Sequence, residues 1–132
     1  MGYKFETSGD TEVILKLYDA YGDSIFNMLN GMWSLVIYNF KTEEYTVSRD
    51  RFGQKPLFYK LDDDNFICAS ELQVITSLIP SSPNVSAIRS FILEGDFDVE
   101  NNTFFSNIFE VPAACFAKFH KGSLVKVTKY WD

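Results

Sequence analysis

Hydrophobic residues recur at two different spacings along this chain, and the change of spacing separates predicted helices from predicted strands. From Asp10 onward, apolar residues lie three or four positions apart between Ile14 and Tyr21, which predicts a helix of about three turns. Asp10 or Ser8 is expected to cap the start of this helix, and Gly22 is expected to end it. A second short helix is predicted at residues 23–29.

The next part of the chain predicts strands. Residues 32–40, MWSLVIYNF, are nearly all apolar and rich in Val, Ile and aromatics, which is typical of a central strand covered on both faces. Polar turns then separate three shorter strands. These are expected at residues 45–48, 57–59 and 66–69. Four successive strands with short connections predict an antiparallel meander.

Helical spacing returns after the meander. A helix is expected from Ser70 or Glu71, with Leu72, Ile75, Leu78 and Ile79 on one face, and another at residues 84–93, with Val85, Ile88, Phe91 and Ile92 spaced for burial. Residues 95–106 are polar and predict a loop, and residues 115–119 and 124–127 predict a closing hairpin. This order predicts an α+β fold, in one domain over residues 1–132, with helices packed on a sheet face.

Composition narrows the classes of function. The chain has 132 residues and a net charge of −6, without the basic stripe that a nucleic-acid partner requires. No apolar run is long enough to span a bilayer, so no membrane partner is expected. Cys68 and Cys115 lie inside apolar runs and are interpreted as buried reduced thiols of a cytoplasmic protein.

Two features invite a metal interpretation and do not support it. The run Asp62-Asp63-Asp64-Asn65 lacks the ligand spacing and the distal Glu of a calcium loop, so a solvated hairpin tip is favoured. His120 is the only histidine and precedes Lys121-Gly122 in a predicted turn, so it has no partner ligands. No metal ligand is therefore assigned.

A turn with a charged pair at its start lies between the second and third predicted strands. Arg49 and Asp50 stand at the end of a strand, Gly53 permits a positive φ, and Pro56 fixes φ where the next strand begins. We interpret Arg49 and Asp50 as residues that hold the turn by charge-assisted hydrogen bonds, without a role in chemistry.

Five sequence blocks occur in an order that resembles the glutaminase domain of asparagine synthetase, a class II glutamine amidotransferase and N-terminal nucleophile hydrolase. They are F-x-T-x-x-D-T-E-V-I-L (5–15), L-x-G-M-W-S-L-V-I-Y (29–38), S-R-D-R-F-G-Q-K-P-L-F-Y (48–59), F-I-C-A-S-E-L-Q (66–73) and T-F-F-S-N-I-F-E-V-P-A-A (103–114) with a final Y-W. The blocks cover nearly the whole chain.

The resemblance implies part of a four-layer αββα sandwich with antiparallel sheets. It also implies that glutamine is hydrolysed and that ammonia passes to a synthetase domain that uses ATP and Mg. By this resemblance, Asp10, next to Gly9, binds the amino group of glutamine. A carboxylate at a loop-to-helix junction suits an ammonium group, although Asp10 as a simple helix cap remains the alternative.

The family's catalytic residues are not matched here. Its nucleophile is an N-terminal cysteine whose own α-amino group is the base, whereas this chain begins Met1-Gly2-Tyr3. The family's glutamine-carboxylate-binding arginine and its Asn-Gly oxyanion pair also have no counterpart. We therefore expect an inactive fragment of a longer chain, with no catalytic residue and no cofactor of its own. The alternative is a binding or scaffold module without a nucleophile, as in β-lactam synthetase. Uncovered strand edges are expected to favour association, including a homodimer.

Overall fold

Two separate units make up the fold of this protein in the computed structural model, which describes residues 4–62, 65–95 and 101–132. The N-terminal unit is Met1–Gly31 and the C-terminal unit is Met32–Asp132. Each unit is described by itself. The centre of the predicted aspartate turn, at Asp63 and Asp64, and positions 96–100 of the predicted loop lie outside the described residues.

The N-terminal unit contains the two predicted helices. Helix α1 spans Asp10–Tyr21, a 3-10 turn spans Gly22–Ser24, and the short helix α2 spans Ile25–Met28. Gly22 ends α1 with φ of +56°, a conformation that costs glycine little, so the predicted stop is confirmed. The Tyr18 and Phe26 rings, one from each helix, lie 6.4 Å apart between centroids.

The C-terminal unit is built on two antiparallel sheets. The four-stranded sheet has the order β1-β2-β6-β7 and the three-stranded sheet has the order β4-β3-β5. The strands are β1 (Ser34–Asn39), β2 (Glu44–Arg49), β3 (Phe58–Asp62), β4 (Asn65–Ala69), β5 (Ile108–Glu110), β6 (Cys115–His120) and β7 (Ser123–Lys129). The closing hairpin, β6–β7, is confirmed, and helices with two antiparallel sheets confirm the α+β class.

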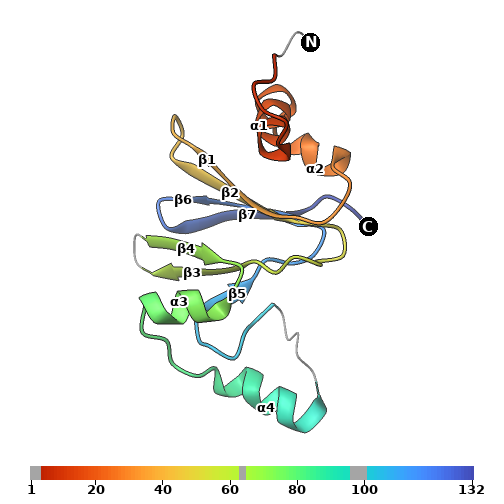
Figure 1. The fold of residues 1–132 in the computed structure, drawn as a ribbon. Helices are drawn as coiled ribbons and strands as arrows, with labels where there is room; N and C mark the ends of the chain where they lie inside the picture. Colours follow the sequence, from red (N-terminus) through yellow and green to blue (C-terminus); the bar gives the residue numbers. More distant parts are fainter. Residues whose placement is uncertain (1–3, 63–64, 96–100) are drawn as a thin grey trace. The chain divides into compact units, whose positions relative to one another are not determined.

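The predicted four-stranded meander is wrong. Strands β1 and β2 form one hairpin and β3 and β4 form another, but β2 pairs with β6 and β3 pairs with β5. The segment between Arg49 and Phe58 therefore carries the chain from one sheet to the other (Figure 1). The local pattern predicted these four strands, but it holds no information about which strands are neighbours.

The prediction that residues 32–40 form a central strand is also wrong. Among the described residues β1 is an edge strand whose one neighbour is β2. Register places Val36 beside Val47 and Tyr38 beside Tyr45, yet Val36 is 42% exposed while Val47 is fully buried. An apolar run indicates what a strand can bury and does not fix its place in the sheet.

The core of the C-terminal unit lies between the two sheets, which are stacked face to face in Figure 1. Phe119 of β6 is fully buried, and its ring lies 4.4 Å from the Phe66 ring of β4 and 5.0 Å from the Tyr59 ring of β3. Helix α3, Leu72–Leu78, packs on the β3–β4 hairpin and buries Ile75. The visible layers of this unit are therefore sheet, sheet and helix, as expected for part of an αββα sandwich.

Helix α4, Val85–Glu94, buries only part of the face that was predicted to be buried. Ala87 is buried and Phe91 contacts Phe104 at 5.3 Å between ring centroids, whereas Val85 and Ile92 are 74% and 73% exposed. Periodicity predicted Phe91 correctly, but it could not exclude Val85 and Ile92, which share its helical spacing. Asn84 caps the helix by accepting the Ala87 amide at 3.2 Å.

Candidate functional site

The candidate site residues lie in the two separate units. Gly9 and Asp10 are neighbours at the start of α1 in the N-terminal unit. Arg49, Asp50 and Gly53 gather in the connection between the sheets of the C-terminal unit, with Pro56 exposed at its end. The structure thus describes two local arrangements. One is the loop of residues 4–9 before α1, and the other is the segment between Arg49 and Phe58, here called the crossing turn.

The loop before α1 is held by a carboxylate that the sequence analysis did not single out. Glu12, in the first turn of α1, accepts the Glu6 amide at 2.9 Å, the Thr7 amide at 2.6 Å and the Thr7 hydroxyl at 2.6 Å. Thr7 Oγ1 in turn accepts the Gly9 amide at 3.4 Å. An acidic residue at the third helical position was the available signal, because such residues commonly bond back to the amides before a helix.

Lys16 extends this arrangement one turn further. Its ammonium lies 2.5 Å from Glu12 Oε1, donates to the Lys4 carbonyl, and lies 4.8 Å from the centroid of the Phe5 ring. The Lys16 ammonium is the largest influence that lowers the pKa of Glu12 to about 2, followed by the Thr7 hydroxyl and the two amides. Glu12 is therefore ionised at neutral pH and can accept all of these hydrogen bonds.

Asp10 is the first residue of α1, and its side chain does not cap the helix. The N-cap is Gly9, with no side-chain capping bond, so the predicted cap by Asp10 or Ser8 is wrong. Within residues 4–62, 65–95 and 101–132, the Asp10 carboxylate, which is exposed, has no hydrogen bond or ion pair. Among these residues nothing occupies the Asp10 carboxylate, and glutamine binding by Asp10 stays a prediction.

Gly9 is not required by the backbone of this loop. Its φ is −82° and its ψ is 147°, which any residue adopts, and a Cβ there would meet Thr7 Oγ1 at an ordinary 3.8 Å. The predicted role of Gly9 at a ligand site also stays untested. Since neither φ nor crowding demands a glycine, close approach of a ligand remains a physical reason for one.

In the crossing turn, Arg49 ties together three loop carbonyls. Its guanidinium donates to Lys55 O at 3.0 Å, to Gly53 O at 2.6 Å and to Val111 O at 2.6 Å. It also pairs with the Glu110 carboxylate at 2.6 Å. Arg49 is only 6% exposed, so its donors are used inside the protein and join the turn to the end of β5.

The Asp50 carboxylate accepts hydrogen bonds from backbone amides of the same turn. Its fully buried carboxylate accepts from Phe52 N at 3.1 Å, Gln54 N at 3.0 Å, Lys55 N at 3.1 Å and Trp33 N at 3.3 Å. Burial is the largest single influence and opposes ionisation, but the four amides together outweigh it, so the pKa of Asp50 is lowered. A carboxylate saturated in this way is suited to holding backbone and not to proton transfer.

The close packing of this turn explains Gly53. Its φ is +62°, and a Cβ there would lie 2.8 Å from Arg49 Nη2 and 3.1 Å from the Ala113 Cβ. Tyr130, which the sequence analysis did not assign, donates its hydroxyl to the Arg49 carbonyl at 2.7 Å. Its ring stacks on Trp33 at 6.1 Å. Aromatic residues near the end of the chain thus close over the turn.

Neither cysteine has the properties of a catalytic nucleophile. Both are free, Cys68 half-buried in β4 and Cys115 buried in β6. Burial raises the pKa of the Cys68 thiol, and burial likewise raises the pKa of Cys115 despite the opposing charge of Lys129. Both thiols are therefore protonated at neutral pH.

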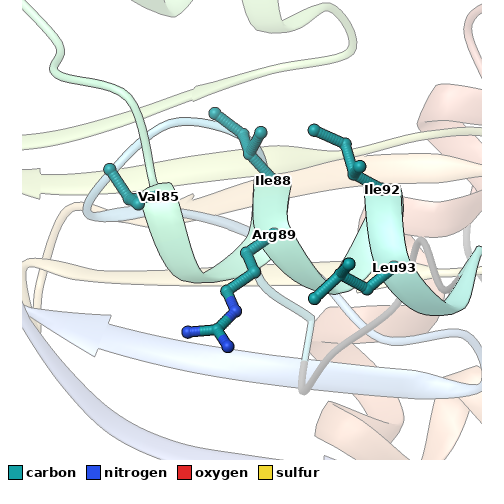
Figure 2. Close-up of a pocket in the computed structure, with 5 residues that line it drawn as sticks. All are labelled: Val85, Ile88, Arg89, Ile92 and Leu93. Atoms are coloured by element: carbon teal, nitrogen blue, oxygen red, sulfur yellow. The ribbon is translucent and has the colours of Figure 1, made fainter.

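Other surfaces offer little chemistry. The outer side of α4 forms an open apolar surface with a volume of about 400 Å³, lined by Val85, Ile88, Arg89, Ile92 and Leu93 (Figure 2). It has no carboxylate or nucleophile. The described residues hold no group of three His, Cys, Asp or Glu side chains that could bind a metal ion. They also include no helix long and apolar enough to cross a membrane.

Comparison with known proteins assigns the family. Residues 1–131 match the glutamine amidotransferase domain family. Asparagine synthetase (glutamine-hydrolyzing) 2 of Bacillus subtilis is 31% identical over 138 residues, which cover 98% of this chain and 18% of that protein. Asparagine synthetase (glutamine-hydrolyzing) 3 of the same organism is 27% identical over 133 residues, 99% of this chain and 22% of that protein. Amidase chry2 of Gibberella zeae is 24% identical over 131 residues, 98% of this chain and 19% of that protein.

The chain thus spans about a fifth of the length of these relatives. The ordered blocks, the two antiparallel sheets and the match over nearly every residue lead to the same assignment, and the resemblance in the sequence is confirmed. This chain belongs to the glutamine amidotransferase domain family and is homologous to glutamine-hydrolysing asparagine synthetases.

Proposed function

We propose that this chain supplies the amino-group side of a glutamine site in a glutamine-hydrolysing asparagine synthetase. The observation that carries the proposal is the family match over residues 1–131. In this proposal the Asp10 carboxylate pairs with the ammonium group of glutamine, and Gly9 leaves room for the ligand beside it. The exposed acceptor at the start of α1 supports this role, because an ammonium ion binds well to an ionised carboxylate.

The charged residues of the crossing turn have a structural role within the C-terminal unit. Arg49 and Asp50 use their charges on backbone groups of the crossing turn, so they stabilise the stacking of the two sheets. The two described cysteines have raised pKa values, so the proposed nucleophile belongs to another segment of the full-length protein. We further propose that ammonia passes to a synthetase domain that uses ATP and Mg, and that the protein is cytoplasmic, in keeping with its free thiols.

A second candidate function is a binding or scaffold module without glutaminase chemistry. The same observation that neither described thiol suits a nucleophile favours it. The two candidates differ in one measurable property, the release of glutamate and ammonia from glutamine.

The test is a glutaminase assay on the full-length protein and on this chain, in parallel. We expect glutamate release by the full-length protein and none by this chain. Absence of release from both would overturn the proposed glutaminase and favour the binding module. If this chain, without the rest of the full-length protein, released glutamate, one of its own residues would be the nucleophile.

A further inference from the structure

The segment before α1 has few of the contacts that usually fix a loop. Residues 4–9 form no helix or strand, and each of them is exposed, as is Asp10. Apolar burial therefore contributes little to their placement, and they lack the ladder hydrogen bonds of regular structure. Polar contacts must fix this segment.

Those polar contacts converge on Glu12. Its carboxylate binds the main chain at Glu6 and Thr7 and the hydroxyl of Thr7, whose oxygen accepts the Gly9 amide. Through Lys16 it is also linked to the Lys4 carbonyl and the Phe5 ring. The Glu12 side chain thus holds the segment from Lys4 to Gly9, either directly or through one neighbouring side chain.

We infer that Glu12 is a positioning residue of the glutamine site, which fixes residues 4–9 against α1 so that Gly9 and Asp10 meet the ligand in one geometry. This inference rests on the proposed function, because Asp10 must bind glutamine for the positioning to affect turnover. Glu12 itself does not touch the ligand, since its oxygens are occupied by loop donors and Lys16. A ligand-binding carboxylate is effective only when its surroundings hold it within a fraction of an ångström.

The experiment compares Glu12→Gln, Thr7→Val and Asp19→Asn with wild type in the full-length protein. Glu12→Gln removes the charge and one acceptor oxygen. Thr7→Val removes a single hydroxyl and leaves the carboxylate in place. Asp19→Asn removes an exposed charge from the same helix, about two turns away, and serves as the control.

Two readouts are measured on each protein. The first is the NMR order parameter of the Thr7 and Gly9 amides, which we expect to fall in Glu12→Gln from about 0.85 to below about 0.6. The second is the kinetics with glutamine and with ammonia. We expect KM for glutamine to rise about tenfold with kcat nearly unchanged. The ammonia-dependent rate should stay at the wild-type level, Thr7→Val should change less, and the control should match wild type.

The readouts separate failure of this inference from failure of the proposed function. Unchanged order of the Gly9 amide in Glu12→Gln overturns the inference, whatever the kinetics. Lower order with an unchanged KM overturns it as well, because the loop would then not matter to the ligand. If wild type does not use glutamine, the proposed function fails, and the amide order alone decides whether Glu12 holds the loop. If Glu12→Gln does not fold, the same readouts on Thr7→Val decide.

Discussion

Asp50 illustrates how a buried charge can serve structure alone. Asp50→Asn keeps the shape of the side chain but turns an amide NH2 toward backbone donors that now bond to a carboxylate oxygen. We expect the free energy of unfolding at pH 7 to fall by about 2–3 kcal/mol, since a buried donor loses its partner. Urea unfolding measures it, with Asp132→Asn as an exposed control that should cost under about 0.5 kcal/mol.

The same variant has a defined pH dependence. The pKa of Asp50 is lowered in the folded state, so its contribution is fully present above the unfolded pKa of about 3.9 and is lost as the pH falls through the folded value. The difference between wild type and Asp50→Asn should therefore be constant from pH 5 to 7, by the same linkage, and shrink below about pH 4. A difference that grows on acidification would contradict the assignment.

Gly53 and Gly95 separate two costs of replacing a glycine. Both have positive φ, +62° and +73°, but a Cβ at Gly53 would lie 2.8 Å from Arg49 Nη2, while a Cβ at Gly95 meets none of the described residues within 4 Å. We expect Gly95→Ala to cost about 1 kcal/mol from backbone strain and Gly53→Ala to cost at least about 1 kcal/mol more. Equal losses in thermal or urea unfolding would show that the turn has room for the methyl group.

Gly9 tests ligand approach without backbone strain. Its φ is negative and a Cβ would be accommodated, so Gly9→Ala should leave the free energy of unfolding within about 0.5 kcal/mol of wild type or raise it. If Gly9 borders the glutamine site, the same variant in the full-length protein should raise KM for glutamine. A stable variant with unchanged KM would remove Gly9 from the proposed site.

At the scale of elements, α4 gives the sharpest test of which face is buried. Phe91→Ala removes the ring that contacts Phe104 and should lower the free energy of unfolding by about 2 kcal/mol. Ile92→Ala truncates a residue that is 73% exposed and should change it by less than about 0.5 kcal/mol. The reverse order in urea unfolding would mean that Ile92, and not Phe91, packs against the protein.

The helices were predictable because their signals are local. The extent of α1, its end at Gly22 and the position of α4 follow from apolar spacing and from a stop residue close by, although the cap predicted for α1 is wrong. The exposure of Val85 and Ile92 was not predictable, because α4 makes its ring contact through Phe91 with Phe104, more than ten residues away. Strand β5 is three residues long and pairs with β3, some fifty residues earlier in the chain, so it had no local signal of its own.

At the scale of the whole molecule, sheet membership was the main failure of sequence reasoning. The Arg49–Pro56 segment has the residues of a hairpin turn, yet it joins two sheets, because Arg49 bonds to Val111 at the end of β5 and Tyr130 bonds to Arg49. Such contacts join residues more than sixty positions apart, which no periodicity reveals. The α+β class and the family were predictable, since they rest on ordered motifs and on the count and order of elements.

The candidate site was predictable only in part. Asp10 came from the resemblance, whereas Glu12 emerged from the contacts of its carboxylate with Glu6 and Thr7. The place of Glu12 in the first turn of α1 was an available signal, but only the contacts show which groups it binds. The structure adds to the sequence the residues that hold the loop.

The most direct test of the central claim is the effect of Asp10→Asn on the full-length protein, measured with glutamine and with ammonia as nitrogen source. We predict that KM for glutamine rises by about a hundredfold, because a charge-assisted bond of about 3 kcal/mol is lost, while the ammonia-dependent rate is unchanged. The control Asp19→Asn should match wild type in both assays. An unchanged KM for glutamine, or an equal loss of both rates, would contradict a role for Asp10 in binding glutamine.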